Sequence, residues 1–337
     1  MRRSTLGRTA VEVTELSFGA AAIGNLFSAV DPEQAALAVD AAWDEGVRHF
    51  DTAPHYGLGL SERRLGAALR SRPRASYTLS TKVGRILDPL PAGTSVPDGG
   101  LDDGFAVPVT HRRRWDFSAD GVRRSIEDSL GRLGLDRVDV AYLHDPDDHA
   151  EAAFGEAYPA LERLRDEGVV GAIGAGMNQT ALLTRFLRDT DVDVVLCAGR
   201  HTLLDGSALD ELLPEAEARG RSVVVGGVFN SGLLADPRPG APYDYAAAPA
   251  ELLERALRMK AVTEAHGVPL RAAALHHSLA HPAVASVLVG TRSPDEVRDA
   301  AALLRTPLPS ALWDDLRAEG LLPAPGAPTG SRTPGQR

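Results

Sequence analysis

The 337-residue sequence predicts a single α/β domain folded as a closed (β/α)8 barrel, the TIM-barrel architecture. Apolar runs of strand length alternate with amphipathic runs of helix length, and the alternation repeats eight times. The alternative is an open doubly wound sheet, whose Gly-x-Gly-x-x-Gly signature after a strand is missing here. The GAGMNQ segment after the fifth strand lacks the third glycine. We therefore favour the barrel.

The order of elements follows from this alternation. The expected strands are 15–21, 47–53, 77–83, 137–145, 169–176, 192–199, 221–229 and 284–290. The helices that follow them begin at 31 and 61 and then cover 121–135, 157–168, 179–189, 209–220, 249–281 and 293–304. Two starts carry capping signals: Asp31 precedes Pro32, with Gln34 placed to close a capping box, and Ser61 is a candidate N-cap.

Three segments lie outside the repeating units. Residues 4–14 are expected to form a small N-terminal β-hairpin around Gly7 and Arg8, covering one end of the barrel. Residues 84–117 form a long irregular loop directly after the third strand, a length typical of active-site lids. Residues 323–337 have the composition of a disordered tail, which leaves 1–322 as one barrel domain.

Composition excludes several classes of protein. The formal net charge is −10, and no basic stripe exists beyond the short run 111–114, which argues against nucleic acid or a membrane as partner. Cys197 is the only cysteine, so an internal disulfide and a zinc–cysteine site are excluded. No apolar run reaches the ~20 residues of a membrane span, and the first residues lack the apolar core of a signal peptide. We expect a cytoplasmic enzyme with a small-molecule substrate.

The active site of a barrel enzyme lies at the C-terminal ends of its strands. The ionisable residues at these ends are Asp51, Tyr56 in the loop beyond it, Lys82 and His144, on the second, third and fourth strands. The ends of the last four strands are instead rich in glycine and poor in charge. This asymmetry favours a proton-transfer group that faces an extended, phosphate-bearing ligand.

Each of these residues also has an ordinary structural interpretation, as a turn, packing or core residue. Lys82 is the most informative, because this chain uses arginine almost everywhere and contains only one other lysine, Lys260. Lysine can shift its pKa, which arginine cannot do. The segment HDPDDH at 144–149 suits zinc or manganese, but Pro146 and its consecutive acids equally indicate a turn. No second ligand cluster follows another strand, so we expect no metal.

Several of these segments resemble the aldo-keto reductase superfamily. The segments FDTAPHYGLGLSERRLG, STKVG and LHD occur in the order found in that family, and the resemblance covers roughly residues 5–305. The segments GAIGAGMNQ, AGRHTLLD and VVVGGVFNSGLL look most like a branch of sugar dehydrogenases. That branch includes L-fucose (D-threo-aldose), L-galactose and pyridoxal 4-dehydrogenases.

The resemblance implies an NAD(P)-dependent oxidoreductase that transfers a hydride between the nicotinamide and a sugar or an aldehyde/alcohol. An aldose 1-dehydrogenase of the L-fucose/D-threo-aldose type is expected, with a pyridoxal 4-dehydrogenase or a general aldehyde reductase as alternatives. A non-catalytic nucleotide-binding regulatory subunit is the alternative of another class. The presence of all four strand-end residues argues against it.

The resemblance also implies roles for the four residues. Tyr56 transfers the proton, and the Lys82 ammonium favours the tyrosinate and lowers its pKa. Asp51 holds and orients Lys82. His144 hydrogen-bonds the substrate oxygen.

The cofactor side follows from the same resemblance. Asn178 is the expected donor to the carboxamide, and Phe229 takes the place of an aromatic stacking residue near Gly226. The expected cofactor-binding residues are Gly19, Ala20, Asn178, Gly226, Phe229, Gly290, Thr291, Arg292 and Glu296. The residues expected to shape the substrate pocket are Phe27, Trp115 and Tyr243.

NAD is expected as the cofactor in preference to NADP. Relatives that prefer NADPH hold its 2′-phosphate with basic residues around the start of the last barrel helix, GTRSPDEVRDAA in this chain. Glu296 stands where such relatives often carry Arg, and Gly290 where they carry Lys. An acid repels a 2′-phosphate but accepts hydrogen bonds from a 2′-hydroxyl. Two alternatives stay open: Glu296 also completes a capping box with Ser293, and Arg292 can supply a compensating charge.

Overall fold

Eight parallel strands close into a barrel in the computed structural model, which describes residues 1–91, 101–244 and 246–323. Each strand pairs with the next one along the chain, and the last pairs with the first. The strands are β3 (Leu16–Gly19), β4 (His49–Asp51), β5 (Thr78–Val83), β8 (Val140–His144), β9 (Ala172–Met177), β10 (Val194–Ala198), β11 (Ser222–Gly226) and β14 (Val284–Gly290). The predicted fold class is therefore confirmed.

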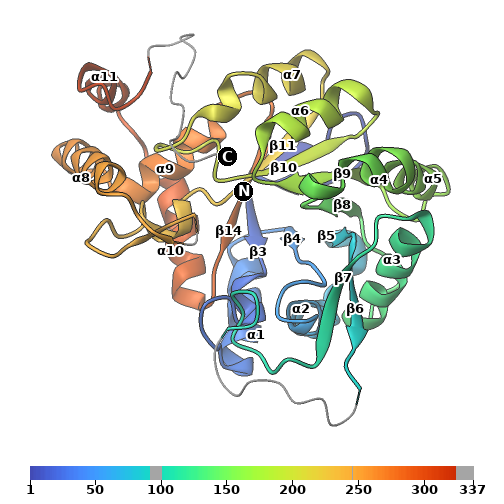
Figure 1. Cartoon of the computed structure of the whole chain (residues 1–337). Helices are drawn as coiled ribbons and strands as arrows, with labels where there is room; N and C mark the ends of the chain where they lie inside the picture. Colours follow the sequence, from blue (N-terminus) through green and yellow to red (C-terminus); the bar gives the residue numbers. More distant parts are fainter. Residues whose placement is uncertain (92–100, 245, 324–337) are drawn as a thin grey trace.

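Helices surround the strands (Figure 1). The outer layer consists of α1 (Pro32–Asp44), α2 (Leu60–Leu69), α3 (Ala119–Leu133), α5 (Tyr158–Asp166), α6 (Thr180–Asp189), α7 (Leu212–Ala218), α9 (Leu270–Leu279) and α10 (Pro294–Arg305). The one-turn helix α4 (Ala150–Ala152) precedes α5, while α8 (Ala250–Ala265) and α11 (Ser310–Ala318) lie outside the ring. The helical region expected over 249–281 is confirmed and consists of two helices, α8 and α9. It divides at Gly267, whose φ of 69° ends α8, and Pro269 then precedes α9.

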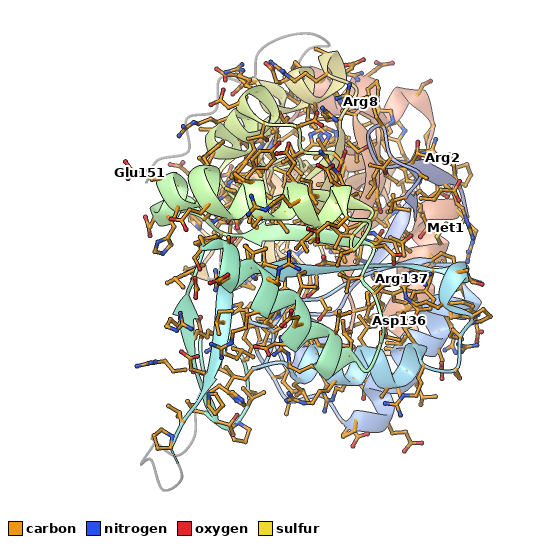
Figure 2. All side chains as sticks on the ribbon, turned by 90° about the vertical axis from the view of Figure 1, so that its right-hand side faces the viewer. Met1, Arg2, Arg8, Asp136, Arg137 and Glu151 are labelled. Carbon is orange, nitrogen blue, oxygen red and sulfur yellow. The ribbon has the colours of Figure 1, made fainter. Side chains whose placement is uncertain are left out.

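The N-terminal hairpin covers one end of the barrel, as predicted. Strands β1 (Arg3–Thr5) and β2 (Glu12–Thr14) pair antiparallel. Leu6 at the turn is fully buried and packs against interior side chains such as Val194 and Val224. Figure 2 shows Met1, Arg2 and Arg8 on the same side of the molecule as Asp136 and Arg137, which precede β8, whereas Glu151, which follows β8, lies on the opposite side. The hairpin therefore closes the end away from the C-terminal strand ends.

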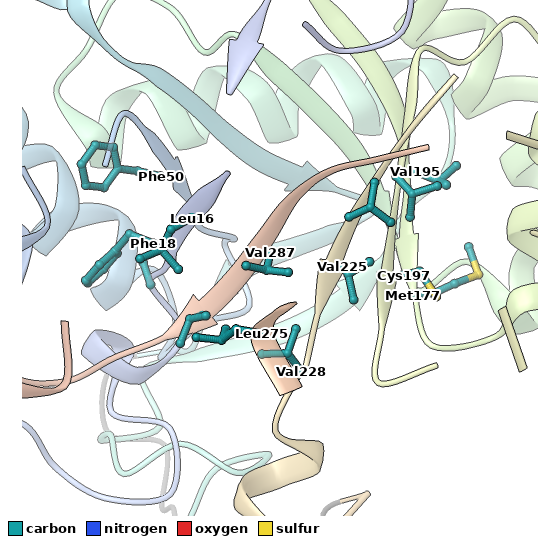
Figure 3. Close-up of a cluster of buried hydrophobic side chains, with 14 of the residues drawn as sticks. Leu16, Phe18, Phe50, Met177, Val195, Cys197, Val225, Val228, Leu275 and Val287 are labelled. Atoms are coloured by element: carbon teal, nitrogen blue, oxygen red, sulfur yellow. The ribbon is translucent and has the colours of Figure 1, made fainter. Parts of the chain in front are cut away.

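The apolar core lies between the strands and the helix layer. Figure 3 shows part of it, including Leu16, Phe18, Phe50, Val225 and Val287. Strand residues with the alternate orientation form a second cluster inside the barrel, as the period of two dictates. Because side chains alternate along a strand, two neighbours in β10 face opposite sides. Cys197 belongs to the outer core, whereas Leu196 faces the barrel interior.

The long segment after β5 is more regular than expected. Its ends, β6 (Arg85–Pro89) and β7 (His111–Trp115), pair antiparallel as a ribbon. Arg85 lies over the ring of its pairing partner Trp115, with 4.3 Å from the guanidinium carbon to the ring centre. A second small ribbon joins β12 (Pro242–Tyr243) to β13 (Ala246–Ala247). The middle of the long segment, 92–100, and the expected disordered tail from 324 lie outside the described residues.

One of the two expected helix caps is wrong, and the capping box expected at the other is not formed. Helix α2 begins at Leu60 after Gly59, and the buried Ser61 hydroxyl instead donates to Ala20 O at 2.8 Å. Asp31 does cap α1, but Gln34 does not close the box, because its side chain donates to Arg292 O at 3.0 Å. No helix among the described residues is long and apolar enough to cross a membrane.

Candidate active site

The structure brings the four predicted catalytic residues together at the C-terminal end of the barrel. Lys82, near the end of β5, and Asp51, the last residue of β4, are almost completely buried, with 2% and 1% of their side chains exposed. The Lys82 ammonium donates to Asp51 Oδ1 at 2.5 Å and to Thr52 O at 3.0 Å. Two bonds to fixed oxygens hold the charged end of Lys82 in one place.

Tyr56 is presented to this pair by the loop between β4 and α2. Gly57 in this loop has a φ of 60°, and a Cβ there would lie 2.1 Å from Gly24 O, so the close approach of the two backbones requires glycine. The Lys82 Nζ lies 4.6 Å from the centre of the Tyr56 ring, so its charge acts directly on the hydroxyl. The His144 ring meets the Tyr56 ring edge-on at 5.8 Å.

Burial and charge act in opposite directions on Tyr56. Burial raises the pKa of Tyr56 to about 12, while the Lys82 ammonium lowers it by a smaller amount. For Lys82, burial lowers the pKa, but Asp51 and Tyr56 together outweigh it, and the net pKa lies above the usual value. Lys82 therefore acts in the expected direction but does not bring the pKa of Tyr56 below its ordinary value. At neutral pH the free protein holds a phenol beside an ammonium.

His144 is neutral in this environment. Burial, followed by the positive charges of Arg85 and Lys82, holds the pKa of His144 well below its usual range. Its Nδ1 is buried and has no hydrogen-bond partner among the described residues, and its Nε2 lies 3.7 Å from Asp145 Oδ2. A neutral imidazole can bond a substrate oxygen without adding a charge to the site.

A buried hydrogen-bond chain fixes the second oxygen of Asp51. Ser80 Oγ donates to Asp51 Oδ2 at 2.7 Å, and His49 Nε2 lies 3.1 Å from Ser80 Oγ. Because an ionised carboxylate only accepts, the Ser80 proton is committed, and His49 Nε2 must be the donor to Ser80. Ser17 then donates to His49 Nδ1 at 2.8 Å. Burial lowers the pKa of His49 to about 4, which keeps the ring neutral as this pattern requires.

We did not predict this series of hydrogen bonds from the sequence, although the spacing of its residues indicates it. His49 and Asp51 are two apart in β4, and Ser80 and Lys82 are two apart in β5. Residues two apart in a strand lie on one face, so the polar pairs predict an interior network below the site.

A cavity of about 530 Å³ opens beside these residues. Of the residues predicted for the site, Phe27, Tyr56, Lys82, His144 and Asn178 line it. Phe105 forms part of its wall, stacked on the Tyr56 ring at a centroid distance of 5.9 Å. Asp51 is not among the lining residues and lies behind Lys82, so it acts on the cavity only through the lysine.

Several residues that were not predicted from the sequence also line the cavity, and three of them bear on its chemistry. They are His55, Arg85 and Asp145. Arg85 is ion-paired with Asp145. The signal for two of them was their position, since Arg85 lies three residues after Lys82 and Asp145 directly follows His144. Burial, with the positive charges of Arg85 and Arg113, lowers the pKa of His55 to about 2.

The strand ends beside this cavity suit the backbone of a dinucleotide. Gly19 pairs with Gly290 and with Asp51 at the ends of three neighbouring strands, and Ala20 N donates to Asp51 O at 2.9 Å. A Cβ on Gly19 would lie 3.3 Å from the backbone of β14. The buried hydroxyl of Thr291 has no hydrogen-bond partner among the described residues. An unpaired buried hydroxyl beside small, uncharged strand ends fits the polar groups of a nicotinamide dinucleotide.

Arg292 and Glu296 lie at the start of α10 and are engaged with the protein. Arg292 Nη1 donates to Ser28 Oγ at 2.9 Å. Ser293 caps the helix by accepting from Glu296 N at 3.2 Å, and the Glu296 carboxylate accepts from Arg292 N at 2.8 Å. The capping interpretation of Ser293 is confirmed. The Glu296 side chain is half exposed and keeps free surface for a ligand.

The remaining predicted residues lie elsewhere. Gly226 ends β11 and accepts a hydrogen bond from Gly199 N at 2.9 Å, and Phe229 packs half-buried against the core. Trp115 stacks on Phe117 in the ribbon, and Tyr243 is buried in β12. None of these four lines the cavity in the described residues.

The segment 144–149 does not gather ligands for a metal. His149 packs against the rings of Trp115 and Phe117, at centroid distances of 5.1 and 5.4 Å. Among the residues that the structure describes, no group of three or more His, Cys, Asp and Glu side chains could hold a metal ion.

The barrel holds Asp51, Tyr56, Lys82 and His144 beside a cavity at its C-terminal end, an arrangement that agrees with the family match. The chain belongs to the aldo/keto reductase family, whose model matches residues 15–319. It is therefore an oxidoreductase that uses a nicotinamide cofactor.

Particular relatives are similar over nearly the whole chain. A D-threo-aldose 1-dehydrogenase from Pseudomonas sp is 45% identical, covering 93% of this chain and 96% of the relative. A pyridoxal 4-dehydrogenase from Microbacterium luteolum is 39% identical, covering 95% and 98%. Among solved structures, the holo form of an aldo-keto reductase from Bacillus halodurans matches with a TM-score of 0.73 and 27% identity, covering 94% and 96%.

Proposed function

We propose that this protein is an aldose 1-dehydrogenase that oxidises the C1 hydroxyl of a sugar with NAD. One observation supports the proposal most strongly: Lys82 is buried between Asp51 and Tyr56 at the wall of the cavity. The similarity to a D-threo-aldose 1-dehydrogenase supports an aldose as the substrate. The bound cofactor supplies the hydride acceptor. A screen of NAD⁺ and NADP⁺ reduction across aldoses and pyridoxal tests the proposal, which fails if no aldose supports reduction.

The roles of the four residues follow from their contacts. Tyr56 takes the proton of the substrate hydroxyl in oxidation and returns it in reduction. Lys82 stabilises the tyrosinate, and Asp51 keeps the ammonium in place through its own bond. His144, neutral and exposed to the cavity, binds the reacting oxygen and orients it toward Tyr56.

The pKa of Tyr56 predicts opposite pH dependences for the two directions. Reduction needs the phenol, which is present below the pKa of about 12, whereas oxidation needs the tyrosinate and should speed up as pH rises. Removing the Lys82 charge raises the pKa of Tyr56 further, so Lys82→Met should shift the oxidation profile to higher pH. The measurement is kcat/KM of sugar oxidation against pH. Lys260→Met is the matched control, because that lysine is exposed on α8 and should leave the profile unchanged.

An unchanged profile in Lys82→Met would show that the ammonium does not control the proton of Tyr56. A profile that shifts equally in Lys260→Met would show that any loss of positive charge has this effect. Either result removes Lys82 from its proposed role.

The preference for NAD is the second part of the proposal. Glu296 repels a 2′-phosphate and has free surface, although its carboxylate also bonds Arg292 N. We expect the wild type to favour NAD⁺ and Glu296→Arg to raise kcat/KM for NADP⁺ by roughly one to two decades, the scale of a charge-assisted contact at ~1.5–3 kcal/mol. Asp295→Arg, at a neighbouring side chain that is 96% exposed, controls for general attraction by a positive charge. A wild type that strongly favours NADP⁺ would show that Arg292 outweighs Glu296.

A pyridoxal dehydrogenase is the second candidate function. The stacked rings of Tyr56 and Phe105, with Phe27 also in the lining, form an aromatic wall that suits a planar substrate. The similarity to a pyridoxal 4-dehydrogenase supports it as well. The same screen decides, since this candidate requires pyridoxal to have a higher kcat/KM than every aldose.

A further inference from the structure

Asp145 holds an unusual backbone conformation at the edge of the active site. It directly follows His144, and its φ of 42° lies in the left-handed region. Residues other than Gly, Asn and Asp rarely adopt this backbone conformation. Its N–H donates to Gly176 O at 3.0 Å, and Arg85 is ion-paired with its carboxylate. Strained residues that the surrounding structure holds in place concentrate at functional sites.

This conformation puts a carboxylate beside the atom that binds the substrate oxygen. Asp145 Oδ2 lies 3.7 Å from His144 Nε2, and both residues line the cavity. Arg85 donates to Oδ2, and Oδ1 has no hydrogen-bond partner among the described residues. With 34% of the side chain exposed, the carboxylate retains capacity to accept a further hydrogen bond.

The spacing matches two neighbouring oxygens of one substrate. Hydrogen bonds to oxygen are ~2.7–3.2 Å long, so one substrate can place an oxygen on His144 Nε2 and a neighbouring oxygen within bonding distance of the Asp145 carboxylate. A hydroxyl on the carbon next to the reacting one can then donate to that carboxylate. Bonds to an ionised acceptor are about twice as strong as neutral ones. An aldehyde or sugar without this hydroxyl leaves the carboxylate unused.

We propose that Asp145, positioned by Arg85, binds the C2 hydroxyl of the substrate and selects sugars that carry one. The proposal rests on the proposed function, because it takes His144 as the residue that binds the reacting oxygen at C1. It narrows the substrate class to aldoses with a hydroxyl next to the reacting carbon.

The test compares an aldose with its 2-deoxy counterpart in four proteins. These are the wild type, Asp145→Asn, Asp145→Gly and Asp148→Asn. Asparagine keeps the size of the side chain and tolerates the left-handed backbone, whereas glycine adopts it without strain and removes the carboxylate entirely. Asp148→Asn removes the same charge from an exposed residue that does not line the cavity.

We expect the wild type to prefer the aldose. Asp145→Gly should lower kcat/KM for the aldose by ~10- to 100-fold, the scale of one charge-assisted hydrogen bond. Asp145→Asn should lower it less, since a neutral acceptor remains. The 2-deoxy sugar should change by less than about threefold in every variant, and Asp148→Asn should behave as the wild type.

The remaining outcomes separate the two proposals. An equal loss of kcat/KM for both sugars in the Asp145 variants overturns the inference, because Asp145 then supports the site without binding the C2 hydroxyl. Equal use of both sugars by the wild type overturns it too, while the aldose dehydrogenase function stands. If the wild type oxidises neither sugar but does oxidise pyridoxal, the proposed function fails and the inference falls with it.

Discussion

Replacing Tyr56 with phenylalanine is expected to lower kcat by ~10²–10⁴-fold, the range typical of general acid–base catalysis. The change removes only the hydroxyl, which is buried against Lys82, and leaves the ring stacked on Phe105. Since the hydroxyl acts in the proton transfer alone, cofactor binding should stay nearly intact. The measurements are kcat with the best aldose from the screen and the Kd of the cofactor, by fluorescence titration.

Tyr77→Phe is the matched control for this prediction. Tyr77 is buried, and its hydroxyl has no hydrogen-bond partner among the described residues, but it precedes β5 at the opposite end of the barrel. Its removal should leave kcat unchanged. Retention of more than half of the wild-type rate by Tyr56→Phe would exclude Tyr56 as the proton-transfer residue.

Replacing Arg132 with methionine should lower the free energy of unfolding by ~3–5 kcal/mol, the usual effect of breaking a buried ion pair. Glu62 in α2 is completely buried, and Arg132 in α3 donates to its Oε2 at 2.5 Å. Thr81 satisfies only the other oxygen, at 2.9 Å. Without Arg132 the carboxylate is buried with a single neutral partner. Urea denaturation of the two proteins measures the difference.

Two variants make this second prediction specific. Arg123→Met in the same helix breaks an exposed pair with Glu167 and should cost at most ~1 kcal/mol. Adding Glu62→Gln to Arg132→Met should recover part of the loss, because no buried charge then remains. A loss in Arg132→Met as small as that in Arg123→Met contradicts the prediction.

The barrel and the catalytic tetrad could be predicted from the sequence for one physical reason. In a parallel barrel all strands end at the same rim, so residues far apart in sequence, such as Asp51, Lys82 and His144, converge there. Their positions in the repeating strand–helix units predict that they meet at this rim, while their proposed roles came from the resemblance to aldo-keto reductases. The alternation within strands would also have identified His49 and Ser80.

Other features depend on tertiary packing and could not be predicted from the sequence. The net pKa of Tyr56 follows from burial, which outweighs Lys82 and has no signature in the residue pattern. An aromatic residue in the long loop predicts a pocket wall at Trp115, but the ribbon register pairs Trp115 with Arg85, and its ring stacks on Phe117 instead of lining the cavity. Asp145 could have been expected near the site because it follows His144, but its positive φ is a property of the folded backbone.

We propose above that this site moves a hydride from C1 of an aldose to the nicotinamide. Incubation of the protein with NAD⁺ and an aldose deuterated at C1, followed by mass spectrometry of the reduced cofactor, tests it directly. We expect the reduced cofactor to carry the deuterium and Tyr56→Phe to form this product at a greatly reduced rate. Reduced cofactor without deuterium, or no reduction with any aldose, would contradict the claim.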